Sequence, residues 1–318
     1  MITPLDPAIA QIIPLLPLRD PDTMTPQGAR DSLVAMARAR PPAQSSARMS
    51  EIAVSGAAGA ISARVYRVGA TPSPTVVFFH GGGWVAGDLE THERQAQLLA
   101  LETGAVVVSV DYRRPPEAPF PAAFEDCLAA LNDVVARIAD FGGDARRIGV
   151  AGDSAGGNLA AACAIAARDD RLALAGQLLV YPVADVAGLY ADAAENARYP
   201  SRQENASGYF LSRATMAWFA RHYLGADANG DDWRVSPLRA RNLAGVAPAV
   251  VCTAWYDPLR DEGQAYADAL AASGVETTRH HGPGLIHGYF GMGDASPAAN
   301  AEAQRVRADF KRLLDRGS

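Results

Sequence analysis

The sequence contains little cysteine, no excess of positive charge and no long apolar run, and each shortage excludes a class of protein. Its three cysteines, Cys127, Cys163 and Cys252, lie far apart among 318 residues, which argues against a disulfide framework or a metal site. The formal net charge of −6 gives no support for binding to nucleic acid or to an anionic membrane surface. No apolar run has the length of a transmembrane helix. We therefore expect reduced thiols, a cytoplasmic location and no metal or cofactor.

The first 48 residues are rich in proline and alanine and lack the basic beginning that signal peptides carry. An apolar cluster at 9–16 is broken by Pro14, whereas a second cluster at 33–36 has helical spacing. Such a segment cannot bury a core of its own. We therefore expect residues 1–48 to lie on a larger domain formed by residues 49–318.

From residue 51 onward, strand-like and helix-like stretches alternate. Two strand-like runs flank a loop with two glycines at 55–60, which predicts a hairpin and an antiparallel start to the sheet. The strand–helix units that follow predict an α/β fold with a mostly parallel central sheet flanked by helices. The alternation fails at about 183–231, which we interpret as an insertion over the C-terminal edge of the sheet. The expected strands are 51–54, 61–68, 75–79, 105–110, 148–151, 176–181, 249–254 and 275–280, and the expected helices are 93–101, 120–141, 157–167, 213–224, 261–273 and 302–314.

Residues 148–160, with the sequence IGVAGDSAGGNLA, have the pattern of a nucleophile on a tight turn. An apolar strand-like run leads into G-D-S-A-G, which fits G-x-S-x-G, and an alanine-rich helical run follows. The two glycines let the strand and the helix approach closely, and the turn holds Ser154 in a strained conformation that exposes its hydroxyl. We therefore expect Ser154 to be a catalytic nucleophile, with the amide of Ala155 at the start of a helix.

A serine hydroxyl becomes a good nucleophile only when a neighbouring base accepts its proton, and that base needs an orienting carboxylate. Among the six histidines, His287 lies in a glycine-flanked loop between the last expected strand and the last expected helix. Catalytic bases occupy such loops at the carboxyl ends of strands. His287 is therefore the expected base, and His281, at the end of the strand itself, is the second candidate.

Asp257 is the expected carboxylate, because it follows the strand 249–254 and precedes Pro258, which cannot continue a sheet. Asp261 and Glu262 fall at the start of a helix. Acidic side chains there interact favourably with the helix dipole, so we expect these two to be helix caps. The order serine, aspartate, histidine along the chain is that of α/β-hydrolases.

The sequence HGGGW at 80–84 directly follows the expected strand 75–79. Successive glycines let backbone amides converge without interference from Cβ atoms, and acyl transfer needs such donors at the developing oxyanion. We expect the amides of Gly82, Gly83 and Ala155 to form this oxyanion hole. A phosphate-binding loop is the alternative, but neither G-x-G-x-x-G nor a G-K-[ST] ending occurs here.

Together these motifs resemble the hormone-sensitive lipase family of α/β-hydrolases, in particular its bacterial G-D-S-A-G esterases. The resemblance covers nearly the whole chain and rests on residues 80–84, 109–113, 119–122, 152–158, 257–263 and 287–288. It implies a carboxylic ester hydrolase that acts on short to medium acyl esters through a Ser154–His287–Asp257 triad and an acyl-enzyme. It also implies a cap built from residues 1–48 and the insertion at 183–231, and many members of the family are homodimers.

The chain departs from the family pattern at two places. Residues 114–119 read RPPEAP where members often have LAPEHP, and Trp255 occupies a position that is often glycine. Because this substitution places a bulky ring near the triad, the family's pocket shape is not carried over. The candidate walls of an apolar pocket, with ordinary packing as the alternative for each, are Trp84, Tyr209, Phe210 and Trp218.

Two rival functions stay open on the residues alone. A triad of this type also serves amide and carbamate hydrolases, and the motifs do not discriminate between these bonds. The plant gibberellin receptors resemble the same family but lack the catalytic histidine, which this chain has at His287. We therefore favour an enzyme over a ligand receptor.

Overall fold

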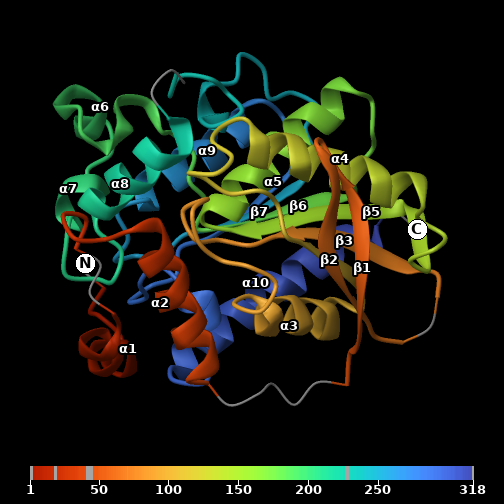
Figure 1. The fold of residues 1–318 in the computed structure, drawn as a ribbon, viewed down its shortest axis with the longest axis horizontal. Coiled ribbons are helices and arrows are strands. Elements are labelled where there is room, and N and C mark those ends of the chain that lie inside the picture. Colours follow the sequence, from red (N-terminus) through yellow and green to blue (C-terminus); the bar gives the residue numbers. More distant parts are fainter. Residues whose placement is uncertain (1–2, 18–19, 41–45, 70, 226–228, 317–318) are drawn as a thin grey trace.

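An eight-stranded sheet crosses the middle of the protein, and helices cover both of its faces (Figure 1). The computed structural model describes residues 3–17, 20–40, 46–69, 71–225 and 229–316. Within them, the strand order is β1-β2-β4-β3-β5-β6-β7-β8. The strands are β1 (Arg48–Gly56), β2 (Gly59–Arg67), β3 (Ser73–Phe79), β4 (Val106–Val110), β5 (Gly143–Asp153), β6 (Gly176–Val180), β7 (Ala249–Cys252) and β8 (Thr277–His280).

The sheet begins antiparallel and continues parallel, as predicted. The β1–β2 and β2–β4 pairs are antiparallel, and the remaining neighbours run parallel. Strands β3, β4, β6 and β7 are buried along their whole lengths, as parallel strands covered on both faces should be. The β1–β2 hairpin is tighter than the expected loop at 55–60, because Gly56 still pairs with Gly59.

Two apolar layers hold the helices on the sheet. Helices α4 (Ala122–Ala136), α5 (Ala155–Asp169) and α9 (Arg260–Ala272) pack on one face, and α3 (Glu93–Thr103) and α10 (Pro297–Asp315) pack on the other. Figure 1 shows these two groups on opposite sides of the sheet. The large core leaves the carboxyl ends of the parallel strands as the place where loops can carry functional side chains.

Helix α4 is shorter than the predicted helix at 120–141. It begins after Pro121 and ends at Ala136, because the next residue, Arg137, leaves the helical region with a φ of −107° and a ψ of 24°. The amide of Gly143, the first residue of β5, then bonds to the carbonyl of Ile138 at 3.0 Å and closes the turn between α4 and β5. Apolar side chains inside that turn continue the helical pattern, which is why the sequence predicted a longer helix.

The N-terminal segment and the insertion lie at the same end of the molecule (Figure 1). Helix α8 has the predicted bounds, whereas short helices α6 and α7 were not expected. None of the helices in the described ranges is long and apolar enough to cross a membrane. The segments comprise α1 (Pro7–Ile12), η1 (Ile13–Leu15) and α2 (Pro26–Arg38) at the N-terminus, and η2 (Ala187–Tyr190), α6 (Ala193–Ala197), α7 (Ser201–Glu204), α8 (Arg213–Leu224) and η3 (Pro237–Arg239) between β6 and β7.

Candidate active site

Ser154 stands on a strained turn between β5 and α5. Its φ of 57° and ψ of −118° are unusual for a residue with a side chain. The turn depends on two glycines, since a Cβ on Gly152 would lie 2.2 Å from the Gly156 carbonyl oxygen, and one on Gly156 would lie 2.0 Å from that of Phe79. The backbone therefore crowds around the turn and leaves the serine hydroxyl to project from its apex.

Ser154, His287 and Asp257 form a continuous chain of hydrogen bonds. His287 Nε2 lies 2.9 Å from Ser154 Oγ, and His287 Nδ1 lies 2.6 Å from Asp257 Oδ2. The ring of Tyr181 packs against the imidazole at 4.5 Å between centroids. Asp257 is fully buried, and its second oxygen accepts the amide of Leu259 at 2.9 Å. The carboxylate and the imidazole are therefore held in one orientation toward the serine.

The loops that carry Asp257 and His287 are bonded to each other. The Tyr256 amide donates to the carbonyl of Leu285 at 2.9 Å, and Tyr256 and Ile286 form an isolated parallel bridge. Asp257 follows this bridge on one loop and His287 follows it on the other. The two side chains reach each other because the loops after β7 and β8 continue side by side beyond the ends of their strands.

The rival histidine and carboxylates lie elsewhere. His281 is exposed, and its Nδ1 lies 3.3 Å from Gln264 Nε2. Asp261 and Glu262 occupy the first turn of α9, as predicted. The expectation that both are simple helix caps is wrong for Glu262, which is fully buried and paired with Arg202 at 2.6 Å.

The glycine-rich loop after β3 approaches the serine turn from the neighbouring strand. Gly82 and Gly83 have φ values of +117° and +61°, in the region that favours glycine. A Cβ on Gly83 would lie 2.3 Å from the ring of Phe219 in α8. Both glycines line the same cavity as Ser154. Ala155 is the first residue of α5, so its amide has no partner within the helix.

Contacts of His80 and its neighbour Gly81 hold the start of the glycine-rich loop in place. The Tyr112 hydroxyl donates to the His80 carbonyl at 2.7 Å, and the two rings stack 4.2 Å apart. Burial lowers the pKa of the His80 imidazole well below its ordinary value, so it stays neutral. Asp153 accepts the next amide, that of Gly81, at 2.9 Å. These contacts fix the strand end from which Gly82 and Gly83 extend.

The cavity beside Ser154 is small, with a volume of about 100 Å³, and both apolar and polar side chains line it. Its apolar walls come from the N-terminal helix α2, from the insertion and from the segment after His287. These residues are Leu33, Met36, Phe210, Leu211, Met216, Phe219 and Met292. Of the four aromatic walls expected from the sequence, Phe210 lines the cavity.

The other three aromatic residues pack elsewhere, which corrects the expectation. Trp84 is fully buried and stacks on Tyr223 at 4.3 Å. Trp218 lies against its helix neighbour His222, at 3.9 Å, and Tyr209 lies against Tyr256, at 4.7 Å.

Trp255 is not part of the described cavity wall, although its sequence position places it near the triad. The Arg260 guanidinium lies over its ring at 5.2 Å, and the described residues that line the cavity do not include Trp255. The ring is therefore near the triad in sequence without forming part of the described cavity wall.

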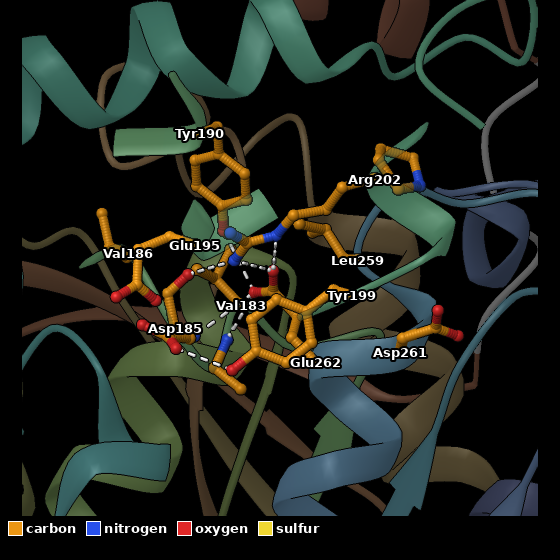
Figure 2. A network of polar contacts seen from close by, with 12 residues as sticks. Val183, Asp185, Val186, Tyr190, Glu195, Tyr199, Arg202, Leu259, Asp261 and Glu262 are labelled. Atoms are coloured by element: carbon orange, nitrogen blue, oxygen red, sulfur yellow. Dashed lines mark hydrogen bonds and ion pairs between the residues drawn. The ribbon is translucent and has the colours of Figure 1, made fainter. Parts of the chain in front are cut away.

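A buried polar network joins the insertion to the start of α9 (Figure 2). Glu262 accepts hydrogen bonds from Arg202, from the Ala184 amide at 2.9 Å and from the Tyr190 hydroxyl at 3.0 Å. Burial raises the pKa of Glu262, while the Arg202 charge opposes that shift. Sequence reasoning missed this pair because 60 residues separate its members and neither has a local signal.

All three cysteines are buried and free. Across the described ranges there is no cluster of three or more His, Cys, Asp or Glu side chains that could hold a metal ion.

The sheet order, the serine on its strained turn and the bonded histidine and aspartate define an α/β-hydrolase. Residues 76–291 match the model of the alpha/beta hydrolase fold family. The chain belongs to this family, in its hormone-sensitive lipase-like group.

Several proteins similar to this chain are esterases. Esterase LipI of Mycobacterium tuberculosis is 38% identical over 306 residues, which is 95% of this chain and 92% of LipI. Carboxylesterase NlhH of the same organism is 42% identical over 247 residues, which is 76% of this chain and 74% of NlhH. A thermostable esterase of Pseudomonas putida superimposes with a TM-score of 0.89 at 33% identity, covering 98% of each chain. An esterase of Pyrobaculum calidifontis has a TM-score of 0.88 at 37% identity, with 98% of this chain and 99% of that one covered.

Proposed function

We propose that the protein is a serine carboxylesterase that hydrolyses short to medium acyl esters through an acyl-enzyme on Ser154. The observation that carries the proposal is the chain of hydrogen bonds from Asp257 through His287 to Ser154 on the wall of a cavity. The similarity to carboxylesterases over most of the chain supports the same activity. The proposed location of the enzyme is the cytoplasm, because its three buried free thiols suit a reducing compartment.

The geometry supports a two-step acyl transfer. Ser154 Oγ attacks the ester carbonyl while His287 Nε2 accepts its proton, and Asp257 holds the imidazole in the required tautomer and stabilises its cation. His287 then protonates the departing alcohol. Water enters, loses a proton to His287 and attacks the acyl-enzyme, which releases the acid and restores the Ser154 hydroxyl.

Three backbone amides bind the negatively charged oxygen of each tetrahedral intermediate. Gly82 and Gly83 line the cavity beside Ser154, and Ala155 follows it at the start of α5. The loop holds these donors in position before the oxyanion forms, so they need no rearrangement when its charge develops. Each such donor lowers the barrier by about 3–4 kcal/mol.

The N-terminal segment and the insertion act as a cap over this site. Leu33 and Met36 of α2 line the cavity together with Phe210, Met216 and Phe219 of the insertion. Because these side chains close a small cavity, the enzyme favours short acyl chains. We extend the cap to residues 1–48 and about 183–231, on a catalytic domain of residues 49–318.

Kinetics of Ser154→Ala test the triad. The variant loses about 10⁴-fold or more in kcat/KM while it keeps the wild-type unfolding midpoint. Ser109→Ala is the matched control, because Ser109 is also buried but lies in β4, outside the cavity. In the wild type kcat/KM falls in acid, since a protonated imidazole cannot accept the serine proton. Wild-type turnover by Ser154→Ala, or a flat profile from about pH 5 to 9, contradicts the assignment.

Two substrate series test which bond the enzyme hydrolyses and which length of acyl chain it prefers. A panel of p-nitrophenyl esters from acetate to palmitate should give the highest kcat/KM for the short members, and a maximum at palmitate would refute the small-cavity argument. An ester paired with its matching anilide separates an esterase from an amide hydrolase, and the proposal requires the ester to react faster. A ligand receptor would turn over neither substrate.

A further inference from the structure

A positively charged side chain, Arg40, lines the cavity of Ser154. It lies two residues beyond the end of α2, is half-buried, and donates from Nη1 to the carbonyl of Gly291 at 2.6 Å. Gly291 ends the short helix η4 (Tyr289–Gly291), which follows His287. The guanidinium therefore stands on the cavity wall, near the segment that carries the catalytic base.

Among the described residues, no carboxylate is in direct contact with this charge. Within the described ranges, no Asp or Glu oxygen lies within 4.0 Å of the Arg40 guanidinium. The nearby Asp294 is bonded to Arg94 instead. Asp153, which also lines the cavity, accepts the Gly81 amide and lies 3.4 Å from His92 Nε2. The hydrogen bond to the Gly291 carbonyl leaves the positive charge of this half-buried guanidinium without a counter-charge in contact, and holding such a charge away from water is costly.

Neutral polar groups that can donate hydrogen bonds lie on the same wall. A Cβ on Gly291 would lie 3.1 Å from Arg40 Nη1 and 3.4 Å from Gln95 Nε2, so both side chains flank this glycine. The Tyr181 hydroxyl is buried and has no hydrogen-bond partner among the described residues. Burial lowers the pKa of Arg40 while Asp294 and Tyr181 oppose the shift, and a guanidinium stays charged at neutral pH.

We propose that Arg40 binds a carboxylate on the substrate, so that the enzyme prefers esters that carry an ionised carboxyl group near the scissile bond. The inference rests on the proposed esterase function. The planar fork of a guanidinium matches a carboxylate with two parallel hydrogen bonds. One cation with neutral donors around it suits a singly charged carboxylate. In the structural alternative, Arg40 only ties the end of α2 to Gly291.

Matched substrates isolate the carboxylate. Monoethyl glutarate and ethyl glutaramate differ by a carboxylate or a carboxamide on the acyl side, and acetoxyacetate and acetoxyacetamide differ in the same way on the alcohol side. The measured quantity is the ratio of kcat/KM within each pair. Wild-type enzyme should prefer the carboxylate in at least one pair by about 10- to 100-fold, the range of a hydrogen bond to a charged group. High salt should reduce this ratio.

Substitution of Arg40 tests the cause of the preference. Arg40→Gln should lower the ratio about 10- to 100-fold, chiefly through a higher KM for the carboxylate, and Arg40→Lys should recover part of it. Arg38→Gln is the matched control, because its side chain is 76% exposed and lies 3.8 Å from Glu90. A merely structural Arg40 would change both substrates of a pair by the same factor, and an unchanged ratio overturns the inference.

The test remains decisive when variants fold poorly. If Arg40→Gln is unstable, the wild-type kcat/KM ratio of carboxylate to carboxamide, and its decrease with salt, still test the proposal. A wild type with no preference for the carboxylate in either pair refutes it. Failure of the esterase function is distinguishable, because the wild type would then hydrolyse neither ester of a pair, or Ser154→Ala would hydrolyse the uncharged ester as fast as the wild type. Ser154-dependent turnover with no carboxylate preference leaves the esterase function standing and removes the role of Arg40.

Discussion

Removing the buried cation Arg202 should destabilise the protein strongly, because Glu262 would be left with an unpaired charge. Both side chains are fully buried, and two guanidinium nitrogens of Arg202 lie 2.6 and 3.1 Å from one Glu262 oxygen. Arg202 also donates to the carbonyl of Asp185 at 2.6 Å. Breaking a buried pair on one side typically costs about 3–5 kcal/mol. Figure 2 shows Arg202 and Glu262 in contact within this network. We expect Arg202→Met to lower the free energy of unfolding by about 3–5 kcal/mol at neutral pH.

The pH dependence of the loss identifies its cause. Burial already raises the pKa of Glu262, and the Arg202 charge opposes the rise. Without Arg202 the folded-state pKa of Glu262 rises further above its unfolded value, so the folded variant binds a proton that the unfolded chain does not. Its stability deficit relative to wild type therefore shrinks as the pH falls.

Urea unfolding of three variants measures these effects. The single variant Arg202→Met should show the full loss of unfolding free energy. The double variant Arg202→Met/Glu262→Gln should recover more than half of that loss, because the side-chain oxygen of the new glutamine still accepts the Ala184 amide. Arg198→Met is the control, because Arg198 belongs to the same network but its side chain is 50% exposed, and it should cost less than about 1 kcal/mol. A deficit below about 1 kcal/mol for Arg202→Met, or one independent of pH, refutes the reasoning.

Two further predictions concern the glycine-rich loop and the stability in acid. Gly83→Ala should reduce kcat at least about 100-fold. The new Cβ would collide with the Phe219 ring, and alanine is strained at a φ of +61°, so the Gly83 amide would be displaced from the oxyanion. A kcat near the wild-type value would contradict this role. A hydrogen bond from His280 is the largest cause that lowers the pKa of Glu302 to about 2. The stabilisation is therefore fully present above the ordinary pKa of a glutamate and is lost as the pH falls toward 2, so Glu302→Gln should cost up to about 3 kcal/mol at pH 6 and almost nothing near pH 2. A cost that is the same at both pH values would refute this linkage.

The sheet could be predicted because its strands carry local signals. Val76, Val107 and Leu178 belong to short apolar runs that a parallel sheet buries on both faces. The contact between Ser154 and His287 could be anticipated in the same way, because the loops that carry them both follow strands that end at one edge of the sheet.

Side-chain directions could not be predicted from these patterns. Trp84 and Phe210 look alike as candidate walls, yet Trp84 packs on Tyr223 and Phe210 reaches the cavity. Their directions depend on the positive φ values of 62° and 75° at these two residues, which no local pattern indicates. The position of Arg40 on the cavity wall depends likewise on how α2 docks, a tertiary property.

Covalent trapping with a p-nitrophenyl alkylphosphonate tests the central claim most directly. Ser154 Oγ should attack phosphorus and release p-nitrophenolate, because the oxyanion donors that stabilise an acyl intermediate also stabilise this adduct. Mass spectrometry should find one phosphonyl group per chain, on the peptide that contains Ser154, in the wild type and in Ser109→Ala. A label on another residue, or equal labelling of Ser154→Ala, would contradict the account.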